Sequence, residues 1–258
     1  MKKEDLAVIT LVPLIIFIAI MFFDLQVSYL VSLLLLFGIP IVYLAYKERK
    51  KLKKISLYSV IIAIPVAVAI DFVGMLDNGW YVAKSSFPFR FFIIPIEDFI
   101  WMISVVFIIV LFYEHFIKKD QKSTVNKEGL KLLAYILYPI ALAVLLLFII
   151  NPDLITFPYA FFWSGFVFFF IPAVVFLTKY PKYILNFFKT GIYSFYIFLL
   201  VELVGLKLDH WVYEGSHYIG WVNFFGLRFP FEEFFYVMII GTFACLSYYE
   251  FFMNKYKR

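Results

Sequence analysis

The chain has 258 residues, of which 64% are hydrophobic and 16% charged, and its formal net charge is +5. Soluble domains of this length are usually about half apolar and about a quarter charged. The composition excludes a soluble globular protein and a disordered chain, and one cysteine, Cys245, cannot form an intrachain disulfide. We therefore predict an all-α, polytopic integral membrane protein.

Eight apolar segments are long enough to cross a bilayer as helices, which takes about 20 residues each. In chain order they cover residues 6–23, 28–46, 56–75, 92–116, 130–150, 157–178, 188–206 and 229–252. These runs are continuously apolar, unlike the short alternating segments of a β-barrel. The first run has no small-residue cleavage site, so we predict a retained helix rather than a signal peptide.

The connections between these segments alternate between basic loops and loops poor in Lys and Arg. If both termini are cytoplasmic, 19 of the 23 Lys and Arg residues lie inside, and the other four are Lys84, Arg90, Lys207 and Arg228. The positive-inside rule then predicts a multi-pass protein of the cell membrane with both termini inside. Contact of the basic loops with anionic lipid headgroups accounts for the net charge without a nucleic-acid partner.

Four short patterns of the first half recur in the same order in the second half, at offsets of 131 to 135 residues. The pairs are Phe37–Pro40 with Phe169–Pro172, Ile70–Gly74 with Val201–Gly205, Pro95–Phe99 with Pro230–Phe234, and Tyr113–Phe116 with Tyr248–Phe251. We predict a duplication, with repeats at residues 1–122 and 123–258. Because four spans return a chain to its starting side, the two repeats would be parallel.

Ionisable residues inside membrane spans are costly, and they commonly mark functional sites. Six acids are predicted at similar depth near the outer face: Asp71, Glu97, Asp98, Glu202, Glu232 and Glu233. Adjacent carboxylates repel in a low dielectric, and loss of hydration adds to the effect, so at least one of each neighbouring pair should keep its proton near neutral pH. Such a carboxyl can act as a general acid.

A purely structural interpretation of the Pro-x-acid-acid pattern remains open. Proline suits the first turn of a helix, and carboxylates there favour the positive end of the helix dipole. Against this, the flanks are apolar, Arg90 and Arg228 stand just upstream, and the pattern occurs twice. Most of the aromatic residues suit lipid contact and interfacial belts. Several lie beside the acids, however, and aromatic faces attract cations, which suits a reaction through a carbocation.

Other constellations are absent from the sequence or weak. No Gly-rich motif opens a helix after a strand, so a nicotinamide or flavin site is not expected. His210, Glu214 and His217 have helix-like spacing, but we favour a solvated interfacial loop over a metal site there. We predict no metal and no cofactor.

The paired Pro-x-Glu-[Glu/Asp] motifs, each opening a membrane helix in a duplicated small membrane protein, resemble the lycopene cyclase domain family. That family is found as two subunits in some bacteria, as one fused chain in archaea and joined to phytoene synthase in fungi. The resemblance is closest over about 68–118 and 199–254, and it includes the segments Asp77–Trp80 and Asp209–Trp211. One departure is Asp98, where the second half has Glu233, so the halves need not be equivalent.

The resemblance implies a redox-neutral lycopene β-cyclase, an intramolecular lyase or isomerase that converts the ψ ends of lycopene to β-ionone rings, giving γ-carotene and then β-carotene. It implies Glu97, Asp98, Glu232 and Glu233 as the acid/base set. The expected surrounding residues are Asp71, Glu202, Pro95, Pro230, Trp80, Trp101, Trp211 and Tyr236. The expected partners are lycopene and other long polyenes, membrane lipid and other carotenoid-pathway enzymes. We favour one composite site over one site per half.

Three alternatives remain. A proton-coupled transporter would use the outer acids as a relay, and the matching Pro40 and Pro172 resemble the interruptions of transporter helices. An intramembrane protease of the Glu-Glu type would need further catalytic partners, and His115 lies at the wrong end of its span. A carotenoid cyclase with another ring isomer or substrate is the third.

Overall fold

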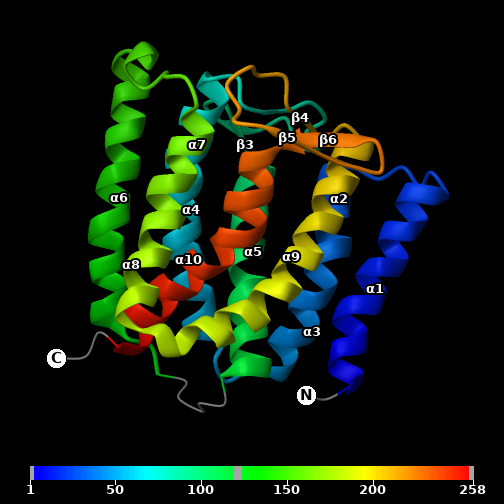
Figure 1. The fold of residues 1–258 in the computed structure, drawn as a ribbon, viewed down its shortest axis with the longest axis vertical. Coiled ribbons are helices and arrows are strands. Elements are labelled where there is room, and N and C mark those ends of the chain that lie inside the picture. The colour runs from blue at the N-terminus through cyan, green and yellow to red at the C-terminus, as the bar shows by residue number, and fades with distance from the viewer. Residues whose placement is uncertain (1–2, 119–123, 256–258) are drawn as a thin grey trace.

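The computed structural model describes residues 3–118 and 124–255, and within these ranges eight helical spans stand side by side (Figure 1). The spans are α1 (Lys3–Phe22); α2 (Tyr29–Leu33) with η1 (Leu34–Gly38) and α3 (Ile39–Lys47); α4 (Leu52–Leu76); α5 (Ile96–Phe112) with η2 (Tyr113–Ile117); α6 (Lys127–Ile150); α7 (Ala160–Gly165) with η4 (Phe166–Phe170) and α8 (Ile171–Lys179); α9 (Ile184–Lys207); and η6 (Glu233–Ile240) with α10 (Gly241–Tyr248) and η7 (Tyr249–Lys255). Short 3-10 turns, η3 (Pro152–Leu154) and η5 (Pro181–Tyr183), precede α7 and α9. The prediction of an all-α polytopic membrane protein with eight spans is confirmed.

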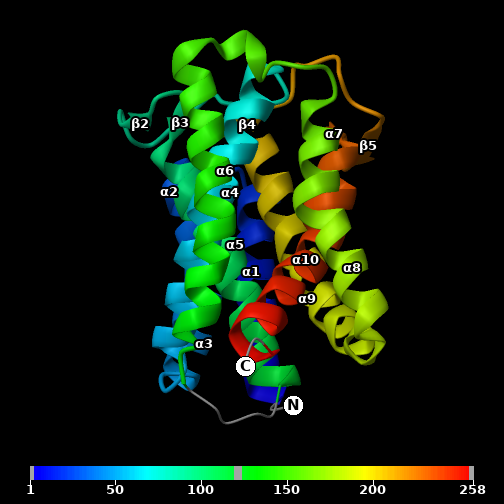
Figure 2. The same ribbon diagram turned by 90° about the vertical axis from the view of Figure 1, so that its left-hand side faces the viewer.

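Three short antiparallel strand pairs lie at one end of the bundle, here called the strand end (Figures 1 and 2). β1 (Tyr81–Val82) pairs with β4 (Trp211–Val212), β2 (Arg90–Phe91) with β3 (Ile94–Pro95), and β5 (Trp221–Phe224) with β6 (Leu227–Pro230). The sequence analysis predicts loops here and begins two spans too early, at residues 92 and 229, so that it assigns β3 and the end of β6 to helices. Strands of two to four residues are too short to show an alternating pattern.

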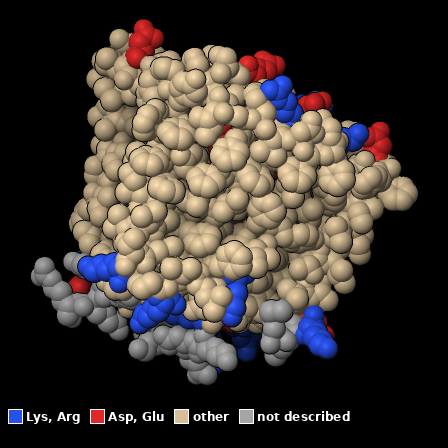
Figure 3. Space-filling model, in the orientation of Figure 1, with Lys and Arg blue, Asp and Glu red and all other residues tan. Residues whose placement is uncertain are grey.

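α1 begins and η7 ends at the opposite end of the bundle, here called the terminal end (Figure 1). In Figure 3 most of the visible Lys and Arg side chains gather at that end, and the side wall between the ends is apolar. Apolar side chains such as Ile15, Leu142 and Val175 are more than half exposed on that wall, as expected of residues that face lipid hydrocarbon.

The two halves contain matching elements, which supports the proposal of two repeats. The second span of each half contains a π-helical segment, η1 or η4, directly before an Ile-Pro pair. α1 of the first half packs on α9 of the second, and α6 of the second packs on α4 of the first. The β1–β4 pair joins the two halves at the strand end. The boundary predicted between residues 122 and 123 lies outside the described residues.

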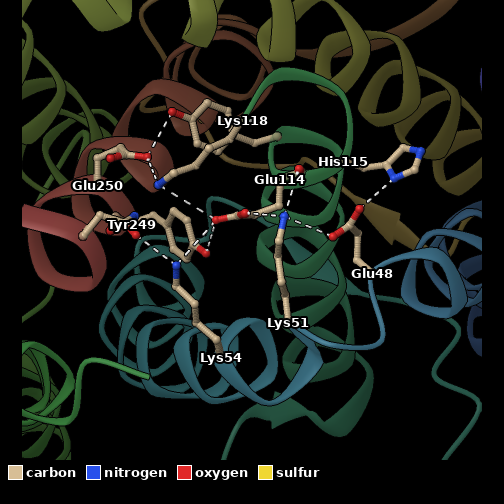
Figure 4. Close-up of polar contacts among 10 residues, drawn as sticks. Glu48, Lys51, Lys54, Glu114, His115, Lys118, Tyr249 and Glu250 are labelled. Atoms are coloured by element: carbon tan, nitrogen blue, oxygen red, sulfur yellow. Dashed lines mark hydrogen bonds and ion pairs between the residues drawn. The ribbon is translucent and has the colours of Figure 1, made fainter. Parts of the chain in front are cut away.

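A buried charge network joins the halves at the terminal end (Figure 4). The Tyr113 hydroxyl donates to Glu250 at 3.0 Å, and the Tyr249 hydroxyl donates to Glu114 at 2.7 Å. Each half thus supplies a tyrosine to the carboxylate of the other half. By this exchange Tyr113 corresponds to Tyr249, whereas the sequence comparison matched it with Tyr248. The shift of one residue arises because the π-helical turns of η6 accommodate an extra residue.

Lysine side chains neutralise the two carboxylates of this network. Lys51 lies 3.0 Å and Lys54 3.6 Å from Glu114, and Lys118 lies 2.7 Å from Glu250. Glu114 and Lys54 are each only 2% exposed. An unpaired charge at such a position would cost several kcal/mol. The network therefore fixes how the two halves meet at this end.

We expect Glu114→Gln to lower the free energy of unfolding by about 3–5 kcal/mol, because it leaves the buried ammonium group of Lys54 without the carboxylate that it contacts and leaves Lys51 with Glu48 alone. Thermal unfolding in detergent micelles measures this. The control is Glu4→Gln on the exposed first turn of α1, which should unfold like the parent protein. Equal midpoints for the two variants would contradict the role given to Glu114.

Candidate active site

A cavity of about 1120 Å³, counting the part open to the outside, lies between the two halves. Four carboxyl side chains line it, two from each half, on α4, α5, α9 and η6: Asp71, Asp98, Glu202 and Glu233. Most other lining residues are apolar or aromatic, among them Ile62, Val66, Val105, Ile109 and Phe169. Four acids therefore share one largely apolar chamber.

The acids lie at one end of this chamber. On α5 the lining residues run from Asp98 to Ile109, which corresponds to about 16 Å along a helix. On the last span they run from Glu233 to Tyr248, again with the acid nearest the strand end. The cavity thus has an acidic end and an apolar shaft. Such a shape suits a long apolar ligand whose reacting group reaches the acids.

Two glycines shape the acidic end. Asp71 and Glu202 lie in the last turns of α4 and α9, and Gly74 and Gly205 follow one turn later. A Cβ atom at Gly74 would lie 2.1 Å from the Trp80 ring, and one at Gly205 would lie 2.2 Å from the Trp211 ring. Only glycine lets the indoles fold back onto the helices, and both indoles line the cavity.

The four carboxyls differ in their hydrogen bonds. The Tyr29 hydroxyl donates to Asp98 Oδ1 at 3.2 Å, and Trp211 Nε1 donates to Glu202 Oε1 at 3.3 Å. Asp98 Oδ2 is buried without a hydrogen bond from any residue that the structure describes. A carboxylate left unpaired in apolar surroundings costs several kcal/mol, and a neutral acid avoids most of that cost.

The structure separates the two acids of each Pro-x-acid-acid motif. Glu97 is fully buried outside the cavity lining, where it accepts hydrogen bonds from the Ser85 hydroxyl at 2.9 Å, the Phe87 amide at 3.1 Å and the Ser86 amide. Glu232 accepts from the Ile219 amide at 2.7 Å. The first acid of each motif thus holds a strand-end loop, and the second acid faces the cavity.

Asp71 and Glu202, which the sequence analysis assigned to the surroundings, line the cavity beside Asp98 and Glu233. The other predicted surrounding residues divide into two groups. Trp80, Trp101 and Trp211 line the cavity. Pro95 and Pro230 lie in β3 and β6, and Tyr236 packs against Gly165 and Phe162. These last three residues are not among the lining side chains.

Sequence reasoning missed Tyr29 and Phe161, which both line the cavity. One signal could have found them. They are 132 residues apart, the offset that also relates Pro40 and Pro172, so they occupy matching positions in the proposed repeats.

The outer histidines have separate structural partners. Burial lowers the pKa of His210, whose neutral ring donates from Nε2 to the Val27 carbonyl at 3.0 Å. His217 pairs with Asp77 at 2.7 Å, and Glu214 accepts from the Tyr81 hydroxyl at 2.9 Å. Within residues 3–118 and 124–255, no three His, Cys, Asp or Glu side chains are grouped to hold a metal ion.

These features define a helical membrane protein whose apolar chamber is lined at one end by acidic and aromatic side chains. The chain belongs to the lycopene cyclase family, since the family model described as Lycopene cyclase matches residues 7–116 and 178–252. The protein is therefore assigned a carotenoid-cyclising role. No curated protein and no solved structure gave a significant match.

The family match confirms the predicted resemblance and extends it. It covers most of the chain, including the first two spans, which the sequence analysis had related to the family only by number and hydropathy. The unmatched residues 117–177 contain α6 and all but the last two residues of the α7–α8 span. Membership of a cyclase family disfavours the transporter and protease alternatives.

We expect Glu97→Gln to loosen the loop at residues 85–87, because an amide accepts hydrogen bonds more weakly than a carboxylate. Hydrogen–deuterium exchange should show faster exchange of the Ser86 and Phe87 amides. Asp98→Asn is the matched control, since Asp98 makes no bond to this loop. Equal protection of these amides in both variants would contradict the separate roles given to the two acids of the motif.

Proposed function

We propose that the protein is a lycopene β-cyclase that works by acid/base chemistry without a cofactor. The observation that carries the proposal is the meeting of Asp71, Asp98, Glu202 and Glu233, from both halves, in one apolar cavity. A protonated carboxyl donates its proton to the terminal double bond of a ψ end. The tertiary cation closes the ring, and a carboxylate removes a ring proton.

The walls of the cavity suit the charge that develops during this reaction. Trp80, Trp101 and Trp211 line the acidic end, and the negative face of an aromatic ring stabilises a nearby cation by about 0.5–2 kcal/mol. The apolar shaft excludes water, which would otherwise capture the cation as an alcohol. Electrons are neither gained nor lost, so the reaction is an isomerisation and fits an intramolecular lyase.

We propose one composite site for both ends of the substrate. The cavity draws two carboxyls from each half, so neither half holds the full set alone. Each ψ end would therefore enter the same chamber in turn, with γ-carotene as the intermediate. Part of the cavity is open to the outside, which supports access for a polyene from the lipid.

The test is expression in a bacterium that accumulates lycopene, followed by chromatography of the pigments. We expect γ- and β-carotene from the parent chain, and at least a hundredfold loss, on the order of a general acid's contribution, in Asp98→Asn. Glu4→Gln, on the exposed surface, is the control and should retain activity.

Two results would contradict this proposal. Unchanged lycopene, despite verified membrane insertion of the parent chain, would refute the proposed cyclase function. Clean accumulation of γ-carotene in Asp98→Asn would show that the halves act independently on the two ends. Products with a different double-bond position would instead correct the β assignment.

We propose that both termini and the charge network face the cytoplasm and the acidic end faces outward, in the cell membrane. The support is the gathering of Lys and Arg at the terminal end. With Cys245 buried, labelling of introduced cysteines reports topology cleanly. Ser216→Cys at the strand end should react with an impermeant maleimide in intact cells, and Lys50→Cys only after lysis; the reverse pattern would invert the orientation.

A further inference from the structure

The acids that line the cavity occupy matching positions in the two halves, but the tyrosine hydroxyl groups of Tyr29 and Tyr213 do not. Tyr29 lines it from the first half, and the matching position of the second half, 132 residues later, is Phe161. Tyr213 lines it from the second half, and the matching position of the first half, 131 residues earlier, is Val82. Among the described residues, the donors Tyr29 and Trp211 orient one acid of each half, Asp98 and Glu202.

Tyr29 holds Asp98 in a defined orientation. The Tyr29 ring is 2% exposed and lies between two rings of the second half, 5.4 Å from His210 and 5.2 Å from Trp211. Its hydroxyl occupies Asp98 Oδ1 and leaves Oδ2 buried without a partner among the described residues. One oxygen is thus fixed, and the other is available to carry a proton toward the cavity.

Two donor side chains, those of Trp211 and Tyr213, lie beside Glu202. Trp211 Nε1 is a donor only, so the Glu202 oxygen that it contacts must accept. The Tyr213 hydroxyl also interacts with Glu202. By contrast, within the described parts of the chain the side chains of Asp71 and Glu233 form no hydrogen bond that would orient them. Asp98 and Glu202 are therefore the two positioned acids of the cavity.

We propose that Tyr29 is a positioning residue that aims Asp98 as the proton donor of cyclisation, and that Glu202, held by Trp211, receives the ring proton. This assignment rests on the proposed cyclase function. The Asp98 O–H bond breaks and a C–H bond forms at the terminal double bond of the ψ end. The next double bond closes the ring onto the cation, and Glu202 takes a proton from the ring carbon, which leaves the ring double bond.

The proton count balances over one turnover, since one proton enters from Asp98 and one leaves to Glu202. Asp71 and Glu233 lie in the same cavity and can return the proton from Glu202 to Asp98 before the next turnover. No oxidant, reductant or second substrate is consumed.

Tyr29→Phe removes one hydroxyl and keeps the ring. In purified protein supplied with lycopene in vesicles, we expect kcat to fall roughly tenfold, the effect of one hydrogen bond, with KM and the product isomers unchanged. The control is Tyr196→Phe, which removes a hydroxyl bonded to the Thr10 carbonyl at 2.6 Å away from the cavity lining. It should keep the parent kcat. Unchanged kcat in Tyr29→Phe, with the same unfolding midpoint as the control, would overturn the role of Tyr29.

Glu202→Gln separates the two proton transfers. If Glu202 is the acceptor, the variant still closes rings, but the cation loses a different proton or captures water, so isomeric rings or alcohols replace β rings. Asp98→Asn should instead leave lycopene unreacted, and Asp98→Glu should recover part of the activity. Unreacted lycopene in Glu202→Gln with altered isomers in Asp98→Asn would reverse the assignment. An inactive parent chain would refute the cyclase function itself.

Discussion

The structure depends on how an apolar bundle accommodates buried carboxyl groups. A lone carboxylate in such surroundings costs several kcal/mol, so each acid must be paired, hydrogen-bonded or neutral. The terminal end uses the first solution, with Glu114 and Glu250 neutralised by lysines and bonded by tyrosines of the opposite half. The strand end uses hydrogen bonds for Glu97 and Glu232, and the proposed function requires a neutral acid among those that line the cavity.

At the strand end, the position of each acid in the Pro-x-acid-acid motif determines whether it bonds a loop or lines the cavity. Glu97 and Glu232 accept hydrogen bonds from loop residues and so form part of the scaffold. Asp98 and Glu233, one residue later in each motif, face the cavity instead. The short step between adjacent helical positions, about 100° of rotation, turns one carboxyl toward the loop and the next toward the ligand space. The loop contacts thereby fix the entry of each helix and aim the second acid.

The proposed duplication explains why one cavity draws on both halves, and later substitutions explain why the halves differ. Matching glycines admit matching indoles at Trp80 and Trp211. Tyr29 and Phe161 no longer match, and neither do Asp98 and Glu233 in length. A symmetric site would present equivalent acids to the substrate, whereas proton donation and proton removal require unequal ones.

The spans, their number and the acids of the site could be predicted from the sequence, because long apolar runs and rare intramembrane charges are strong signals. The grouping of the acids could not. Glu97 and Asp98 are neighbours in sequence, and only the loop that bonds Glu97 shows that they point apart. Tyr29 was missed because one tyrosine among 19 carries no signal of its own, and its bond to Asp98 spans 69 residues.

The most direct test of the account is a structure of the Asp98→Asn variant with lycopene bound, since this variant should hold the substrate without protonating it. We predict the ψ end at the acidic end of the cavity, with its terminal double bond within about 3.5 Å of residue 98 and the future ring carbon facing Glu202. The polyene should continue along the apolar shaft toward the lipid. A ψ end seated beside Glu97 or Glu232, or two ends bound separately in the two halves, would contradict the account.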